Sequence, residues 1–281
     1  MKIREKLDHF IKKSKIATHL LPVFLTVILM LILFFITDFF YDRFVGKMLF
    51  ETQVLAFADT ISNPSFAIKK VILNSSASAT STGEKQKDFW SLNIYQYTDM
   101  AFYIDPLNDL PENKIKSLTI DQINLWTKPS LGTGNLYYKN PLEFGKSDSI
   151  IEDHLISDSL SYEILQSDAQ IDYTKPQFYE DCSTPLVLEY LNKDIKTNCI
   201  ISNTGTPLVY DGSLLKRGNI TLNSIAANLS FHIIITTQSD QQYVCNVTLA
   251  IPLEDQKTNL YAGNYTQILD SVSNMKFYKL K

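Results

Sequence analysis

The longest uninterrupted apolar stretch of the chain lies near its N-terminus. No charged residue occurs between Ile16 and Thr37, and most of these 22 residues are Leu, Ile, Val or Phe. As a helix the stretch is roughly 33 Å long, which matches a hydrocarbon core of about 30 Å. The pattern therefore predicts a transmembrane helix over 16–37. Its membrane-anchoring side chains are predicted to be Leu21, Phe24, Leu25, Ile28, Leu29, Ile32 and Phe35.

Two other interpretations of this stretch are a buried core helix and a cleaved signal peptide. A soluble helix rarely lacks charge over six turns, which disfavours the first. A signal peptide has an apolar region of about 7–15 residues followed closely by a small-x-small cleavage site. The nearest match, Ala56-Phe57-Ala58, lies well beyond the apolar run. We therefore expect an uncleaved anchor.

The charges on either side of this anchor predict its orientation. Six Lys or Arg residues precede the span, whereas only Arg43 and Lys47 follow it closely, beside Asp38 and Asp42. Because cytoplasmic flanks are enriched in Lys and Arg, residues 1–15 are expected to be a short basic cytoplasmic tail. The sequence thus predicts a single-pass protein of the plasma membrane, with the lipid bilayer as one partner and the C-terminal part extracellular.

The residues that follow keep a helical pattern and then lose it. Apolar positions recur at three- and four-residue steps until Asn63-Pro64, and proline disfavours helical geometry in the residue before it. We expect a membrane-proximal helix or stalk over 38–73, helical to about Ser62; a helix lying on the bilayer surface is the alternative. Residues 74–88 are rich in Ser and Thr and are expected to be a linker or loop.

From Phe89 onward the hydrophobic pattern has a period of two, which is typical of strands. The clearest case is 228–251, where two alternating segments flank a polar connection at 238–242 and predict an antiparallel hairpin. The predicted fold is an N-terminal transmembrane helix followed by a mainly-β exported domain, an antiparallel β-sandwich over 89–281. Two smaller sandwiches split near 147–181 are the alternative. Further strands are predicted at 89–104, 115–126, 135–139, 161–165, 186–191, 198–202, 207–210, 218–223 and 276–280.

Charge and composition limit the function classes. The part after the span, 38–281, carries 20 basic and 28 acidic residues, a net charge of −8. An acidic domain repels phosphate backbones, so we expect no nucleic-acid partner. Lys outnumbers Arg 23 to 3, which favours an AT-rich genome and a bacterial source.

Catalytic and metal-binding signatures are weak. His154 has Asp153 beside it, but neither Gly-x-Ser-x-Gly nor His-Glu-x-x-His occurs. The stretch 147–181 holds nine acidic residues without the spacing of a calcium loop, so a solvated acidic loop is favoured over a calcium site. We expect no catalytic residue, no metal site and no cofactor.

The three cysteines all fall in the predicted exported part, where a disulfide could persist. Cys182 and Cys199 are the simplest pair, and Cys245 shares a strand face with apolar residues. A Cys182–Cys199 disulfide and three free buried thiols are equal possibilities.

The aromatic residues of 89–138 are expected to fill the sandwich core; stacking on sugar rings is the alternative. Taken together, the sequence predicts a membrane-anchored extracellular β-sandwich that is a non-enzymatic binding module for an unknown protein or glycan at the cell surface. One alternative is a structural subunit of a membrane complex that assembles through its transmembrane helix. Thr18, Thr26 and Thr37 could form interhelical hydrogen bonds there. The third hypothesis is an anchored hydrolase, for which the sequence shows no catalytic motif.

Overall fold

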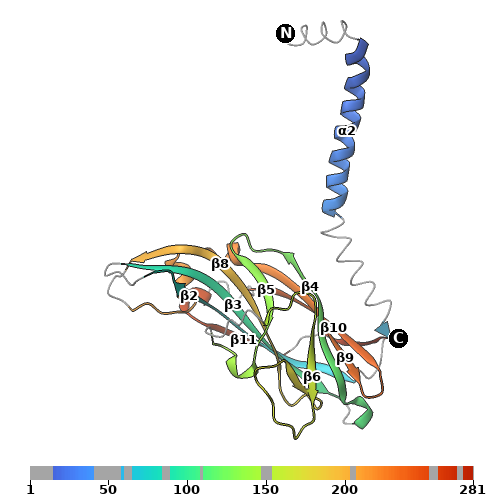
Figure 1. The fold of residues 1–281 in the computed structure, drawn as a ribbon, viewed down its shortest axis with the longest axis vertical. Coiled ribbons are helices and arrows are strands. Elements are labelled where there is room, and N and C mark those ends of the chain that lie inside the picture. Colours follow the sequence, from blue (N-terminus) through green and yellow to red (C-terminus); the bar gives the residue numbers. More distant parts are fainter. Residues whose placement is uncertain are drawn as a thin grey trace. The chain divides into compact units, whose positions relative to one another are not determined.

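The computed structural model describes residues 15–40, 58–59, 65–83, 89–107, 110–146, 154–202, 207–252, 259–270 and 275–280. The chain divides into two compact units, Met1–Phe57 and Ala58–Lys281. The first unit contains helix α2 (Lys15–Phe40), and the second contains all the described strands (Figure 1).

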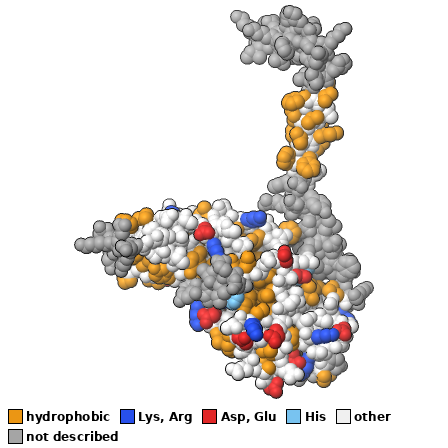
Figure 2. All heavy atoms as spheres, viewed as in Figure 1, with side chains coloured by type: hydrophobic (Ala, Val, Ile, Leu, Met, Phe, Trp, Pro, Cys, Tyr) orange, Lys and Arg blue, Asp and Glu red, His pale blue; other side chains and the backbone are white. Residues whose placement is uncertain are grey.

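Helix α2 has 26 residues, and Pro22 lies in its N-terminal part. Its described apolar side chains are exposed, and Figure 2 shows them along the helix. Five of the predicted anchoring side chains belong to this set, whereas those of Leu21 and Leu25 lie outside the described residues. Among the described parts of the chain, we find no helix with the length and apolarity needed to cross a membrane.

The second unit is mainly β and consists of two sheets. The seven-stranded sheet has the order β1-β12-β10-β9-β4-β6-β7, and the five-stranded sheet has the order β11-β2-β3-β8-β5. Neighbouring strands are antiparallel except for β6 and β7, which are parallel. The strands are β1 (Ala58–Asp59), β2 (Phe66–Ser81), β3 (Phe89–Pro106), β4 (Ile115–Thr127), β5 (Thr133–Tyr138), β6 (Leu160–Leu165), β7 (Gln177–Tyr179), β8 (Leu186–Ser202), β9 (Ala227–Thr237), β10 (Gln242–Ile251), β11 (Tyr265–Leu269) and β12 (Phe277–Leu280).

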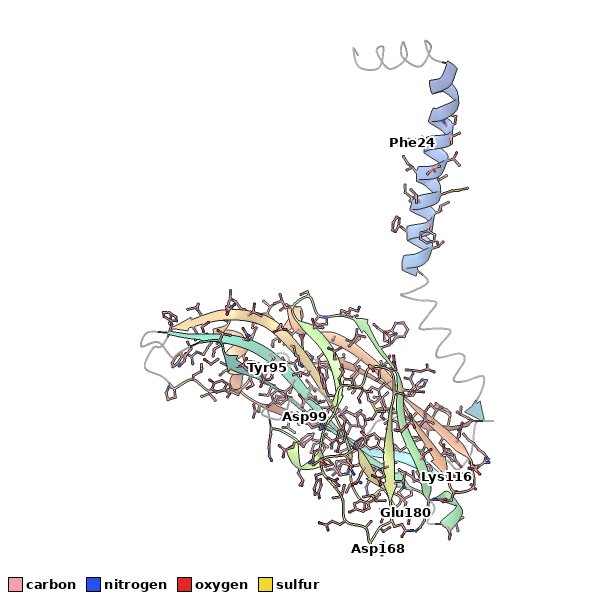
Figure 3. All side chains as sticks on the ribbon, in the orientation of Figure 1. Phe24, Tyr95, Asp99, Lys116, Asp168 and Glu180 are labelled. Atoms are coloured by element: carbon pink, nitrogen blue, oxygen red, sulfur yellow. The ribbon has the colours of Figure 1, made fainter. Side chains whose placement is uncertain are left out.

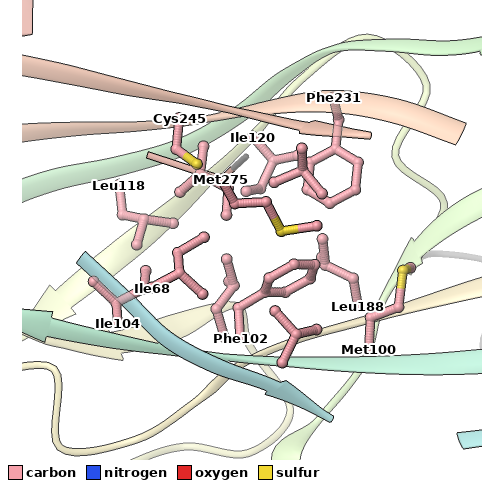
Figure 4. Packing of buried hydrophobic residues seen from close by; sticks show 14 of the residues in the cluster. Ile68, Met100, Phe102, Ile104, Leu118, Ile120, Leu188, Phe231, Cys245 and Met275 are labelled. Carbon is pink, nitrogen blue, oxygen red and sulfur yellow. The ribbon is translucent and has the colours of Figure 1, made fainter. Parts of the chain in front are cut away.

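The two sheets share one apolar core. Phe102 of β3 and Phe231 of β9 are both fully buried, and their rings meet edge to face with centroids 5.8 Å apart. Figure 4 shows residues of both sheets, with Met275, interleaved in this main core. Because the side chains of a strand point alternately to the two faces of its sheet, one apolar face from each sheet is enough to form the main core. This arrangement is consistent with a β-sandwich.

A second apolar cluster lies over the other half of the long strands of the five-stranded sheet. Strands β2, β3 and β8 have 16, 18 and 17 residues, compared with 11 and 10 in β9 and β10. Their additional length is covered by the short helix α4 (Ser213–Arg217) and by the 3₁₀ turn η5 (Leu222–Ile225). The members of this second cluster are Ala77, Leu92, Ile94, Ile195, Cys199, Ile201, Leu214, Leu215, Ile220, Leu222, Ile225 and Leu260.

The predicted hairpin at 228–251 is confirmed by β9 and β10, which pair from Ala227 opposite Ile251 to Thr236 opposite Gln242. The predicted linker at 74–88 is wrong over 74–81, because these residues belong to β2 and pair with β3. The side chains of 74–78 are buried in the sheet, where Ser75 and Thr98 share a hydrogen bond of 2.8 Å.

Other predictions also need correction. Residues 58–59 form β1 rather than a continued helix, since they pair with β12; residues 41–57 and 60–64 lie outside the described residues. Residues 207–210 are not a strand, and 218–223 form the turn that follows α4 and the start of η5. The alternative of two sandwiches split near 147–181 does not hold, because both sheets take strands from before and after that stretch.

Candidate functional site

The β unit has a pocket of about 610 Å³ that is lined by residues of both sheets, including the edge strand β5. Strands β4 and β9 contribute from the seven-stranded sheet, and β5 contributes from the five-stranded sheet. Such a volume is typical of small-molecule sites. The lining residues are Ile123, Asn124, Leu125, Lys128, Pro129, Gly132, Thr133, Gly134, Asn135, Leu136, Leu155, Ile156, Ser157 and Leu229.

A bulge in β4 helps to open this pocket. The pairing of β4 with β9 shifts register between Asp121 and Asn124, and Gln122 has a positive φ of 49°. Strand β6 pairs with β4 only at Leu118–Ile120, so the segment after the bulge has no strand on that side among the described residues. Bulges bend the strand that carries them and often occur beside binding sites.

Two glycines shape the pocket wall on the β5 side. Gly132 has a φ of 86°, and a Cβ there would overlap the Asn192 amide. A Cβ on Gly134 would overlap the Tyr190 hydroxyl. Only glycine allows these backbone atoms to approach β8 so closely.

Two polar atoms lie behind those glycines. The Tyr190 hydroxyl and Asn192 Oδ1 are buried, and neither has a hydrogen-bond partner among the described residues. Burial also raises the pKa of the Tyr190 phenol. Neither residue lines the pocket, so the two unsatisfied atoms belong to the packing behind its wall, where a polar group without a partner is costly.

The lining side chains determine which chemical groups the pocket can hold. Its lining is mostly apolar, and Lys128 is the only charged side chain among the lining residues that the structure describes. None of the described lining residues is His, Cys, Asp or Glu, so Lys128 is the one titratable side chain among them. The arrangement can hold an apolar body and place one cation beside it.

A second feature is a buried charge cluster on the other face of the five-stranded sheet, formed by Asp99, Lys139 and Glu189. Lys139 Nζ lies 2.8 and 2.9 Å from the two carboxylate oxygens of Asp99 and 2.6 Å from Glu189 Oε2. It also donates to the Lys146 carbonyl at 2.8 Å, and the Gly145 N–H donates to Asp99 Oδ2 at 2.6 Å. Figure 3 labels Asp99 on β3. The exposed fractions of the three residues are 0%, 3% and 6%.

Burial changes the acidities in this cluster. It raises the pKa of Glu189 to about 7 and also raises that of Asp99, while the ammonium of Lys139 opposes both shifts. A hydrogen bond between the two carboxyl groups raises the pKa of Glu189 and lowers that of Asp99. Glu189 is therefore the carboxyl group that takes up a proton more readily.

Neither feature was predicted from the sequence. For the charge cluster, a signal was present in the sequence. Asp99 and Glu189 are each the single charge in an otherwise uncharged strand segment, and Lys139 directly follows a third uncharged segment. Lone charges in buried strands need partners. The pocket depends on a bulge and two glycines, which no sequence pattern distinguished from ordinary turns.

The predicted site residues lie apart from both features. Cys182, Cys199 and Cys245 are free thiols: Cys182 packs against the main core, Cys199 belongs to the second cluster and Cys245 to the main core. The structure therefore does not contain the Cys182–Cys199 disulfide, since its two partners lie in different clusters. The anchoring side chains belong to α2, in the other unit.

The two histidines of the β unit, His154 and His232, contact different neighbours. His154 packs against Tyr138 with ring centroids 5.0 Å apart, and Asp153 lies outside the described residues. His232 lies on the face opposite to Phe231, as its strand position predicts, but is only 4% exposed and contacts Asp121 at 3.4 Å. No group of three His, Cys, Asp or Glu side chains within the described ranges could hold a metal ion.

Comparison of the chain with protein families, with characterised proteins and with solved structures shows no significant match.

Proposed function

We propose that this chain is a single-pass, membrane-anchored antiparallel β-sandwich that acts as a non-enzymatic binding module on the extracellular side. The observation that carries the proposal is the pocket between β4 and β5. It combines an apolar lining, one cation and no acid–base or nucleophilic pair among its described residues. These features favour a ligand with an apolar body and an anionic group near Lys128.

Although no described helix meets the length and apolarity of a membrane span, the uncharged run 16–37 and the exposed side chains of α2 support the proposed anchor. Its described apolar side chains from Val23 to Phe35 are exposed, as expected of a helix that faces lipid. The Thr26 hydroxyl donates to the Pro22 carbonyl at 2.8 Å, and the Thr37 hydroxyl donates to the Leu33 carbonyl at 2.9 Å. Hydroxyls that are satisfied inside their own helix can enter an apolar medium at low cost.

The same hydrogen bonds weaken the alternative of a structural subunit that assembles through this helix. That hypothesis used Thr26 and Thr37 as interhelical donors, and both hydroxyls already have acceptors within α2. An anchored hydrolase has no supporting arrangement among the described residues. We therefore retain the binding module.

Ligand binding can be tested with dodecanoate, an apolar chain with one carboxylate, and with uncharged dodecanol as a matched probe. We expect saturable shifts of the pocket methyl signals in NMR spectra of residues 58–281, which form one compact unit. The variant Lys128→Gln should weaken dodecanoate binding several-fold and leave dodecanol binding unchanged.

A steric variant gives the control for this experiment. Ser157 lines the pocket and is exposed, whereas Ser183 is exposed and lies outside it. Ser157→Trp should abolish binding of both probes, and Ser183→Trp should not. Equal binding by all variants, or no saturable binding by the native sequence, would refute the pocket as the site.

The topology is tested on intact cells with added protease. The β unit should be digested and an N-terminal tag protected, because six basic residues precede the predicted span. Alkaline carbonate should not release the undigested protein from membranes. A digested tag with a protected β unit would show the opposite orientation. Release of the protein from membranes by carbonate would exclude the anchor.

A further inference from the structure

Three strands of the five-stranded sheet bring the charge cluster together from distant parts of the chain. Asp99 of β3 is opposite Glu189 of β8, and Glu189 is in turn opposite Tyr137 of β5. Lys139 follows Tyr137 by two residues and so projects from the same face. The central strand thus places Glu189 between an amine and a carboxyl group. We propose that Lys139 and Asp99 condense to an intramolecular isopeptide bond, with Glu189 as the catalytic proton carrier.

The approach of the two reacting groups favours this step. Lys139 Nζ is nearly equidistant from the two oxygens of Asp99, at 2.8 and 2.9 Å. With carboxylate bonds of about 1.2 Å, that position puts Nζ roughly 3 Å from Asp99 Cγ. This distance is within the range of about 3–3.5 Å that a near-attack conformer requires, and attack additionally needs Nζ to approach from above the carboxylate plane. The Lys146 carbonyl and the ring of Tyr97, whose centroid is 5.2 Å from Nζ, help to hold the amine there.

The charge balance of the cluster supplies a driving force. One ammonium and two carboxyl groups share a site from which water is almost fully excluded. Keeping an ammonium and a carboxylate in such a site carries a desolvation penalty, which their attraction only partly offsets. An amide is neutral, so condensation removes both charges and releases one water molecule. Glu189 is then left as the carboxylate that it was before the reaction, and because burial raises its pKa, it can take up one proton from solvent and become neutral.

The atoms of the reaction balance without any co-reactant. The Lys139 ammonium gives one proton to Glu189, whose Oε2 is 2.6 Å from Nζ. The neutral Nζ then attacks Asp99 Cγ, and a C–N bond forms. Charge develops on Oδ2, where the Gly145 N–H donates at 2.6 Å. One Asp99 oxygen leaves as water with the proton from Glu189 and a second proton from Nζ, so the amide keeps one hydrogen and Glu189 returns to its starting state.

The test is the intact mass of the purified full-length chain, followed by peptide mapping. We expect a mass lower than the sequence mass by one water molecule, and a branched peptide that joins the segments around Asp99 and Lys139. A folded protein with the full sequence mass would overturn the proposal. So would a water loss that maps to any other pair of residues.

Two variants separate the chemistry from folding. Asp99→Asn should condense with loss of ammonia instead of water and reach the same final mass as the native chain. Glu189→Gln keeps a hydrogen-bonding side chain but cannot carry the proton, so condensation should slow by at least about 100-fold. The fluorescence spectrum of Trp90 and Trp126 reports whether each variant is folded. A folded Glu189→Gln variant that condenses as fast as the native chain would remove Glu189 from the mechanism.

The isopeptide bond and the proposed ligand pocket stand on different residues. The mass measurement can therefore refute the isopeptide bond while the chain still binds its ligand. In the same way, a loss of ligand binding would leave the isopeptide proposal untouched.

Discussion

The edge-to-face contact between Phe102 and Phe231 offers a direct test of whether the two sheets pack face to face. The first ring comes from the five-stranded sheet and the second from the seven-stranded sheet, and both are 0% exposed. Their centroids are 5.8 Å apart with an interplanar angle of 90°. A pair of this geometry stabilises a fold by about 0.5–1.5 kcal/mol beyond the area that it buries.

The perturbation is replacement of each ring by leucine, singly and together. Alanine would cost about 3–5 kcal/mol at each site, and the two losses together would approach the whole stability of a domain. Leucine keeps most of the apolar volume, so we expect about 1–2 kcal/mol for each single variant. Since the ring contact is lost only once, the double variant should cost about 1 kcal/mol less than the sum of the single variants.

The assay is urea unfolding of the full-length chain in detergent micelles, followed by tryptophan fluorescence. The chain has two tryptophans, Trp90 and Trp126, and both belong to the β unit, so the signal does not depend on α2. As a control, Phe102→Leu is combined with Ile220→Val, because Ile220 belongs to the second cluster. That pair should be additive within about 0.5 kcal/mol. Additivity for Phe102 and Phe231 as well would mean that the rings do not interact and would refute the packing of the two sheets at this point.

Four further predictions concern single side chains. Tyr190→Phe should leave the unfolding free energy unchanged or raise it slightly, because its hydroxyl has no described partner; a loss above about 1 kcal/mol in urea unfolding would mean that the hydroxyl is satisfied. Ala77→Leu should destabilise the β unit by about 1–3 kcal/mol, since Ala77 is fully buried in the second cluster, and an unchanged unfolding midpoint would contradict that burial. Burial lowers the pKa of His232 below that of the unfolded chain despite Asp121, so the folded state binds fewer protons. Stability should thus fall as the pH drops below about 6.5, and His232→Gln should flatten this part of the curve of unfolding free energy against pH. Burial raises the pKa of the Cys245 thiol to about 12, so iodoacetamide at pH 8 should label it only after unfolding, and rapid labelling of the native protein would show that it is accessible.

Several elements of the fold could be predicted because their cause is local. The hairpin of β9 and β10 follows from strict alternation on both sides of a polar connection, which specifies both the strands and their register. Strands β3, β4, β6 and β12 were predicted for the same reason. Strand β8 was predicted only as two separate strands, 186–191 and 198–202, because the residues 192–197 between them are mostly polar and register shifts against β3 interrupt the pattern there.

Other elements have causes that lie elsewhere in the chain. Residues 74–81 have the composition of a linker, yet they form half of a central strand. Their neighbours in the fold explain this: β3 supplies the hydrogen bonds, and α4 packs close to β2 at Ala77, where a larger side chain would not fit. The pocket has a similar origin, because Gly132 and Gly134 matter only through β8 behind them.

The sequence by itself determined the apolar helix, the β class of the rest of the chain and the strongest hairpin, since these depend on the order of neighbouring residues. Only the tertiary structure decided which strands became neighbours. That choice placed Asp99, Glu189 and Lys139 within hydrogen-bonding distance, although 40 and 50 residues separate them along the chain. The physical reason is that periodicity fixes the face on which a side chain lies, whereas its contacts depend on strand order and register, which long-range packing selects.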